Sequence, residues 1–243
     1  MDDSFAIVRA LVEPKFDIRG LCSAQWHTQA NAPNDSVGRS QHMNKDLLTL
    51  MGKSAIPHPM GSNTPMVSQL RAQPSPAARL IINEAHKMPK GEKLTVLTLG
   101  PATNTASAIL LDPSILPKLK CCYLGLWYNI KDQTWNKREF NTDNDPNALN
   151  VLLNTQNLEL EIMTATTSKT LVFEKEQVNK YFKGKGGVFD FASANELWRA
   201  SVETLDFVPL VNASYSGGII TVSYTHLRAH ETGRNLVCRL LLE

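Results

Sequence analysis

A carboxylate and a carboxamide stand two residues apart in the middle of the chain, at Glu139 and Asn141. On an extended segment both side chains would point to the same side of the backbone. Asp145 and Pro146 then open an apolar run, residues 148–153, that predicts a helix. An aspartate before a helix accepts a backbone N–H, and a proline at the first helical position gives up a donor that has no partner there. A plain helix cap is the favoured interpretation for this second pair, whereas local chemistry leaves the role of the first pair open.

The same stretch resembles the signature of the inosine/uridine-preferring nucleoside hydrolase family, in which Glu-Phe-Asn precedes Asp-Pro-x-Ala. Two further segments agree in order and spacing. Residues 99–104 are similar to the family's Gly-Pro-Leu-Thr-Asn turn, and Asp2-Asp3 is similar to the end of its Asp-x-x-x-Asp-Asp motif. The resemblance covers about residues 2–170. It implies that Glu139 and Asn141 hold ribose hydroxyls and that Asp2 contacts the ribose.

The resemblance also implies a calcium ion, with Asp3 and the backbone carbonyl of Leu99 among its ligands. The family's first aspartate, the general base and a further ligand, would lie four residues before Asp2, and no His-Asp pair like the family's closing one occurs in the sequence. Calcium takes six to eight oxygens, so two protein donors cannot hold it tightly. We therefore expect calcium in the complete protein, an incomplete metal site here, and no retained catalytic residue.

Two segments depart from the family pattern close to the expected ligand. Trp26 and His27 stand where the family has Gly-Asn, and Gly125-Leu126-Trp127 replaces Met-Gly-Gly. His27 is a candidate substrate-binding residue, since its ring can donate to a sugar or base, and Trp26 can stack on one. A surface histidine without such a role is the alternative. These departures leave the identity of the substrate open.

The elements that must position these residues alternate between strands and helices. Helices are expected over residues 4–11, 43–51, 75–85 and 103–111 and from Pro146 onward, and strands over residues 17–24, 94–99, 121–127 and 158–164. A short strand and turn is expected at 56–61, and weaker helical segments extend to about residue 204. This alternation predicts an α/β fold, an open, mostly parallel, doubly wound sheet with helices on both faces. Such sheets bind ligands at the carboxyl ends of their strands.

Composition sets outer bounds. With 243 residues and 42% hydrophobic residues, the chain is most simply one domain. A net charge of +2 with interspersed signs gives no sustained basic face, which argues against nucleic acid as a partner, and no apolar run is long enough to span a membrane. The four cysteines lack a Cys-x-x-Cys spacing, which indicates reduced thiols and favours the cytoplasm. A homo-oligomer remains an open option.

The stretch from Val222 to the end does not continue the pattern. His226, His230 and Glu231 suggest a metal site, but their order differs from the zinc-protease His-Glu-x-x-His and no third ligand is evident. The stretch resembles translated adapter sequence rather than part of a native fold. We therefore expect an incomplete nucleoside hydrolase-like domain at residues 1–221 and a non-native tail at 222–243.

These features together predict an N-glycosyl hydrolase. The parent protein is expected to split ribonucleosides into base and ribose, as in purine or pyrimidine salvage, and this chain is expected to be nearly inactive. One alternative is a non-catalytic nucleoside- or sugar-binding relative. Another is a hydrolase of a different ribosyl or glycosyl compound on the same fold. An unrelated doubly wound protein is the least favoured interpretation, because three ordered motifs would have to coincide.

Overall fold

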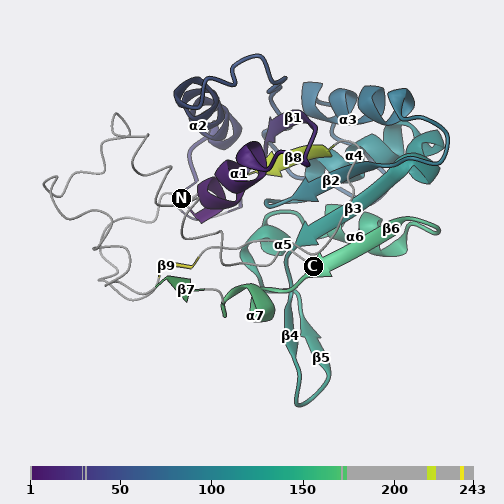
Figure 1. Ribbon diagram of the computed structural model, residues 1–243. Coiled ribbons are helices and arrows are strands. Elements are labelled where there is room, and N and C mark those ends of the chain that lie inside the picture. Colours follow the sequence, from purple (N-terminus) through teal and green to yellow (C-terminus); the bar gives the residue numbers. More distant parts are fainter. Residues whose placement is uncertain are drawn as a thin grey trace, which may run out of the picture.

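Five parallel strands form the central sheet of the computed structural model (Figure 1). Their order across the sheet is β1 (Ile18–Ser23), β8 (Gly218–Val222), β2 (Leu94–Thr98), β3 (Leu119–Leu124) and β6 (Glu159–Met163). The structure describes residues 2–28, 30 and 32–170 and the backbone of short strands at 172–173, 218–222 and 236–237. Every neighbouring pair in the sheet is parallel. All five strands therefore end at one edge.

Helices cover both faces of this sheet. One face is covered by α1 (Asp2–Val12) and α2 (Ser36–Leu50), and the other by α3 (Pro76–Lys87), α4 (Thr103–Leu111), the 3-10 helix η1 (Pro113–Lys118) and α6 (Pro146–Asn154). Successive strand residues supply the two cores: Leu21 packs with α1 and α2, whereas Cys22 packs with α3 and α4. The predicted α/β architecture is confirmed.

Helix starts follow the capping residues in the sequence. The Ser75 hydroxyl accepts a hydrogen bond from Ala78 N at 3.1 Å, with Pro76 at the first helical position of α3. Helix α2 begins at Ser36, seven residues before the predicted start, because Asp35 accepts from Gly38 N at 2.9 Å and caps it there. Its polar first turns concealed this start.

Two local predictions were wrong. Residues 56–61 form no strand, since Pro57 and Pro59 have no N–H for a ladder, although Leu21 N donates to the Pro57 carbonyl at 2.9 Å. Glu139 and Asn141 do not share one side of an extended segment. Helix α5 (Phe140–Asn144) begins directly after Glu139, so Asn141 is helical.

The predicted strand at residues 121–127 is also shorter at its end. Strand β3 stops at Leu124, and Leu126 adopts a left-handed φ of 64° that turns the chain. An antiparallel hairpin follows, with strands β4 (Trp127–Asn129) and β5 (Thr134–Asn136), and Figure 1 shows it projecting away from the sheet.

Strand β8 was missed. It lies between β1 and β2, and its sequence, Gly-Ile-Ile-Thr-Val, is the β-branched run typical of a buried parallel strand. It includes Val222, which pairs with Ser23, so the boundary at 221/222 stays a prediction. Strands β7 (Val172–Phe173) and β9 (Leu236–Val237) pair with each other.

Other late predictions fall outside the described residues. Helix α7 (Ala165–Ser168) is described, but the weaker helical segments expected to about residue 204 are not. The same applies to His226, His230 and Glu231. Within the described part of the chain, no helix is long and apolar enough to cross a membrane.

Candidate functional site

The side chain of Asn141 joins the carboxyl ends of two sheet strands. Its Nδ2 donates to the backbone carbonyl of Leu99, just after β2, at 2.8 Å, and to that of Leu124, the last residue of β3, at 2.9 Å. The carboxyl edge of a parallel sheet is where α/β proteins bind ligands. Two predicted site residues, Leu99 and Asn141, are thus in direct contact at this edge.

Glu139 is the N-terminal cap of α5, the helix that contains Asn141. Its Oε2 accepts hydrogen bonds from Asn141 N at 3.0 Å, Thr142 N at 3.2 Å and the Thr142 hydroxyl at 3.4 Å. The side chain is 3% exposed. These contacts fix the orientation of the carboxylate at the start of α5.

Asp145 does more than cap the following helix, the role predicted for it. Its Oδ1 accepts from Ala148 N at 2.9 Å, which confirms the cap. Its Oδ2 accepts from the Thr103 hydroxyl at 2.6 Å and from Met66 N at 2.9 Å. Burial raises the pKa of the Asp145 carboxyl, and these hydrogen bonds oppose the rise. The carboxylate fastens the start of α4 to the start of α6.

Gln25 belongs to the candidate site but was not predicted as a site residue. Its Nε2 donates to the Asn144 carbonyl at 3.0 Å and to the Thr103 hydroxyl at 3.4 Å, and its Oε1 accepts from His27 N at 2.5 Å. The glutamine is fully buried. The signal available in the sequence was an amide side chain directly after an apolar, strand-like run. It holds the segment after β1 against α5.

His27 and Trp26 have different environments within this segment. The His27 side chain is exposed, beside Thr28, whose hydroxyl donates to Asn144 Oδ1 at 2.8 Å. Trp26 is 5% exposed, so its ring is not a free stacking surface and that part of the prediction was wrong. Its indole N–H is buried without a hydrogen-bond acceptor among the described residues.

Asn104 has a structural role at the end of the sheet. Its Nδ2 donates to the Ser23 carbonyl at 2.9 Å, and its Oδ1 accepts from Ser62 N at 3.2 Å and the Ser75 hydroxyl at 3.3 Å. Gly61 packs so closely on this group that a Cβ there would lie 2.2 Å from the Ser23 carbonyl oxygen. Asn104 therefore joins the end of β1, the loop before α3 and the start of α4.

The family model described as inosine-uridine preferring nucleoside hydrolase matches residues 1–227. The chain belongs to this family. Several solved nucleoside hydrolases share its fold. A plant nucleoside hydrolase superposes with a TM-score of 0.61 at 19% identity, covering 84% of this chain and 70% of that one. An inosine-guanosine nucleoside hydrolase gives 0.60 at 18%, covering 86% and 71%.

The inosine-uridine preferring nucleoside hydrolase from Bacillus anthracis gives a TM-score of 0.60 at 16% identity, covering 86% of this chain and 73% of that one. A comparison with curated proteins gave no match. The family is one of metal-dependent hydrolases that act on small-molecule nucleosides. Membership places this nucleoside hydrolase homologue among N-glycosyl hydrolases, as the sequence predicted.

The metal donors expected of a nucleoside hydrolase are only partly assembled in the described residues. Asp3 is 8% exposed and lies one turn before Ile7, which packs in one cluster with Leu99. The Leu99 carbonyl, however, accepts from Asn141. No group of three His, Cys, Asp or Glu side chains suited to a metal occurs in the described part of the chain, and the side chain of Asp2 lies outside it. These donors do not fit calcium, which takes six to eight oxygens.

Proposed function

We propose that the complete protein hydrolyses the N-glycosidic bond of ribonucleosides, giving base and ribose, in purine or pyrimidine salvage. The observation that carries the proposal is the family match over residues 1–227. The gathering of Glu139, Asn141 and Gln25 at the carboxyl edge of the sheet supports it. We further propose that this chain of 243 residues turns nucleosides over only slowly.

Hydrolysis of a glycosidic bond passes through an oxocarbenium-like transition state and needs the ribose held in one orientation. Asn141 donates both its N–H groups to strand ends, so its Oδ1 is the atom that would accept from a ribose hydroxyl. From the resemblance, Glu139 is proposed to accept a second ribose hydroxyl, with its carboxylate oriented by the capping bonds from Asn141 N and Thr142 N. Asp2 is proposed as a further contact from the resemblance, and His27 because its exposed ring can donate to a sugar or base.

The slow turnover follows from what generates the nucleophile. In glycoside hydrolysis a carboxylate accepts the proton of the attacking water. Glu139 is committed to the start of α5, and Asp145 to Thr103 and Met66. Calcium, with Asp3 and Leu99 as ligands, stays a prediction of the resemblance. Orientation of the ribose alone does not deprotonate water.

A non-catalytic nucleoside- or sugar-binding protein is the second candidate. Leu126, which replaces a family glycine, is 4% exposed and adopts a left-handed φ of 64°. A bulky side chain is thus kept at a backbone position that favours glycine. This difference from the family pattern, just after the end of β3, supports a binding protein as an alternative. A hydrolase of another ribosyl or glycosyl compound would also fit this difference.

The test is ribose release from inosine and uridine by the purified chain, with calcium and with a chelator, together with binding of inosine, uridine and ribose by calorimetry. We expect the chain to bind these compounds but to turn them over far more slowly than the roughly 1–1000 per second that is typical of enzymes. Glu139→Gln should weaken binding, whereas Glu92→Gln, on the exposed surface, should not.

Each other outcome has a definite meaning. Calcium-dependent turnover at ordinary enzyme rates would contradict the slow-turnover proposal. Binding of ribose and nucleosides without any turnover, even in a longer form of the protein, would favour the binding protein. Absence of binding for all three probes would overturn a nucleoside site at Glu139 and Asn141.

A further inference from the structure

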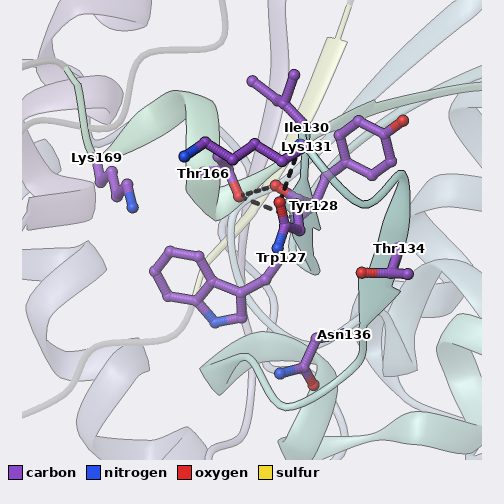
Figure 2. A pocket seen from close by; sticks show the side chains of 9 residues that line it. Trp127, Tyr128, Ile130, Lys131, Thr134, Asn136, Thr166 and Lys169 are labelled. Carbon is purple, nitrogen blue, oxygen red and sulfur yellow. Dashed lines mark hydrogen bonds between the residues drawn. The ribbon is translucent and has the colours of Figure 1, made fainter.

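A cavity of about 480 Å³ lies between the β4–β5 hairpin and helix α7 (Figure 2). Its volume is within the range of about 300–1000 Å³ found for small-molecule pockets. The proposed nucleoside site leaves this cavity unused. Its lining consists of Trp127, Tyr128, Asn129, Ile130, Lys131, Thr134, Asn136, Thr166 and Lys169.

The hairpin presents two chemically different faces. Trp127 pairs directly with Asn136, and Asn129 pairs with Thr134, so these four side chains share one face. On the other face the rings of Tyr128 and Trp135 pack with their centroids 4.6 Å apart. One face therefore combines a single indole with hydroxyl and amide groups, and the other is aromatic.

The base of the hairpin is fixed to the wall of the cavity. The Thr166 hydroxyl of α7 accepts from Tyr128 N at 2.9 Å and donates to the Tyr128 carbonyl at 2.8 Å, the contacts dashed in Figure 2. Asn129 accepts from Lys131 N at 3.0 Å and so orders the turn. The cavity is thus a built feature rather than a gap beside a loose arm.

The cavity is positively charged. Lys131 and Lys169 line it, and the adjacent carboxylate of Asp132, which accepts from Asn129 Nδ2 at 2.6 Å, leaves the lining with a net positive charge. Within the described residues neither lysine forms an ion pair, and the Lys169 ammonium lies 5.4 Å from the centre of the Trp127 ring. A ligand that carries both a planar ring and an anionic group could use this pair: its ring could stack on the indole, and its anionic group could pair with the ammonium.

We propose that this cavity binds a free mononucleotide. The base stacks on the Trp127 indole, where it displaces the ammonium of Lys169, and the phosphate pairs with Lys169 and Lys131. The Thr134 hydroxyl and the Asn136 amide lie on the same hairpin face and supply hydrogen bonds to the sugar or base edge. The proposal concerns binding alone and does not rest on nucleoside hydrolysis.

Calorimetric titration of the full chain with uridine 5′-monophosphate and adenosine 5′-monophosphate tests the proposal. Trp127→Ala should weaken binding about 10-fold, the scale of one base stacked on an aromatic ring. Lys169→Gln should weaken it similarly for the nucleotides but leave uridine unaffected. Trp135→Ala, on the opposite hairpin face, and Lys137→Gln, whose ammonium bonds Asn150, are matched controls expected to bind as the unaltered chain does.

Several results would overturn the proposal. One is nucleotide binding that survives both Trp127→Ala and Lys169→Gln; another is absence of nucleotide binding at millimolar concentration. Inorganic phosphate or ribose 5-phosphate binding as tightly as the nucleotides would remove the role of the ring. A short single-stranded RNA binding more tightly than either mononucleotide would assign the cavity to RNA instead. Glu139→Gln should leave nucleotide binding intact, which separates this outcome from failure of the nucleoside site.

Discussion

Asn141 Nδ2 lies 2.8 Å from the Leu99 carbonyl oxygen and donates a hydrogen bond to it. The family resemblance gave these two groups separate roles, one toward ribose and one toward a metal. Here they are partners, and the same amide also reaches Leu124. Through these contacts Asn141 links the ends of β2 and β3, a structural role in addition to any role in binding. The candidate site therefore depends on the carboxyl ends of these two strands being correctly placed.

Asn141→Ala should therefore lower stability. It removes the donor of two carbonyl groups, and each buried polar group left without its partner costs about 1–3 kcal/mol. Urea denaturation of the variant against the unaltered chain measures the effect. Asn154→Ala, an exposed asparagine at the end of α6, should change the free energy of unfolding by less than about 0.5 kcal/mol. Equal stability of the two variants would show that the tie contributes nothing.

The buried Asp145 should make stability depend on pH. Burial raises its pKa above the ordinary 3.8, so the folded chain binds the proton more readily than the unfolded chain. The contribution of this group to the free energy of unfolding is then largest below its ordinary pKa and declines as pH rises through the raised pKa. Asp145→Asn removes the titration. The free energy of unfolding of both chains should be measured between about pH 3 and 7. The difference in free energy between the unaltered chain and Asp145→Asn should fall as pH rises, and a difference that increases with pH would contradict a raised pKa of Asp145.

Leu126 and Gln133 offer a matched test of backbone strain. Both have left-handed φ, 64° and 53°, which costs a non-glycine residue about 1–2 kcal/mol. Leu126 is buried in the main core, and loss of a buried leucine costs about 2–5 kcal/mol. Leu126→Gly should thus destabilise the chain, whereas Gln133→Gly, in the exposed hairpin turn, should be neutral or stabilising. Stabilisation by Leu126→Gly in thermal unfolding would show that strain outweighs burial.

Three thiols should be inert in the folded chain. Desolvation raises the pKa of Cys121 and Cys122 to about 12, and it raises that of Cys22 as well. Only the thiolate reacts with disulfide reagents, and at pH 8 a group with a pKa near 12 is ionised to about one part in 10⁴. In a Cys238→Ser chain, a chromogenic disulfide reagent should label these thiols only after denaturation. Fast labelling under native conditions would contradict their burial.

Much of the fold followed from local pattern. Helix α4 has the predicted bounds, because Gly100-Pro101 precedes it and Asp112-Pro113 ends it. Helix α2 was found only in part, since its first turns carry Gly38, Arg39 and Gln41 rather than an apolar stripe. Strand β8 was missed because it follows a long stretch without clear periodicity and its place between β1 and β2 is a matter of topology.

The candidate site was less predictable. The types and spacing of Glu139, Asn141 and Asp145 marked the correct segment, but their partners come from distant parts of the chain. No local pattern indicates that Gln25 bonds Asn144 or that Thr103 bonds Asp145. The cavity beside Trp127 is formed by a hairpin that begins where the backbone turns at Leu126. The left-handed conformation of Leu126 could not be predicted, because leucine rarely adopts it.

Strand β8 has a consequence for how the chain is made. Among the described strands, β1 lies at the border of the central sheet, and its one neighbour there is β8. Ile18 can therefore pair only after Gly218 has been synthesised. Pairings between such distant segments form late, because the loop between them must close first. During synthesis the first strand and the face covered by α1 therefore remain open until most of the chain has left the ribosome. A nascent chain stalled before residue 218 would expose an unpaired β1, the kind of edge that chaperones shield from aggregation.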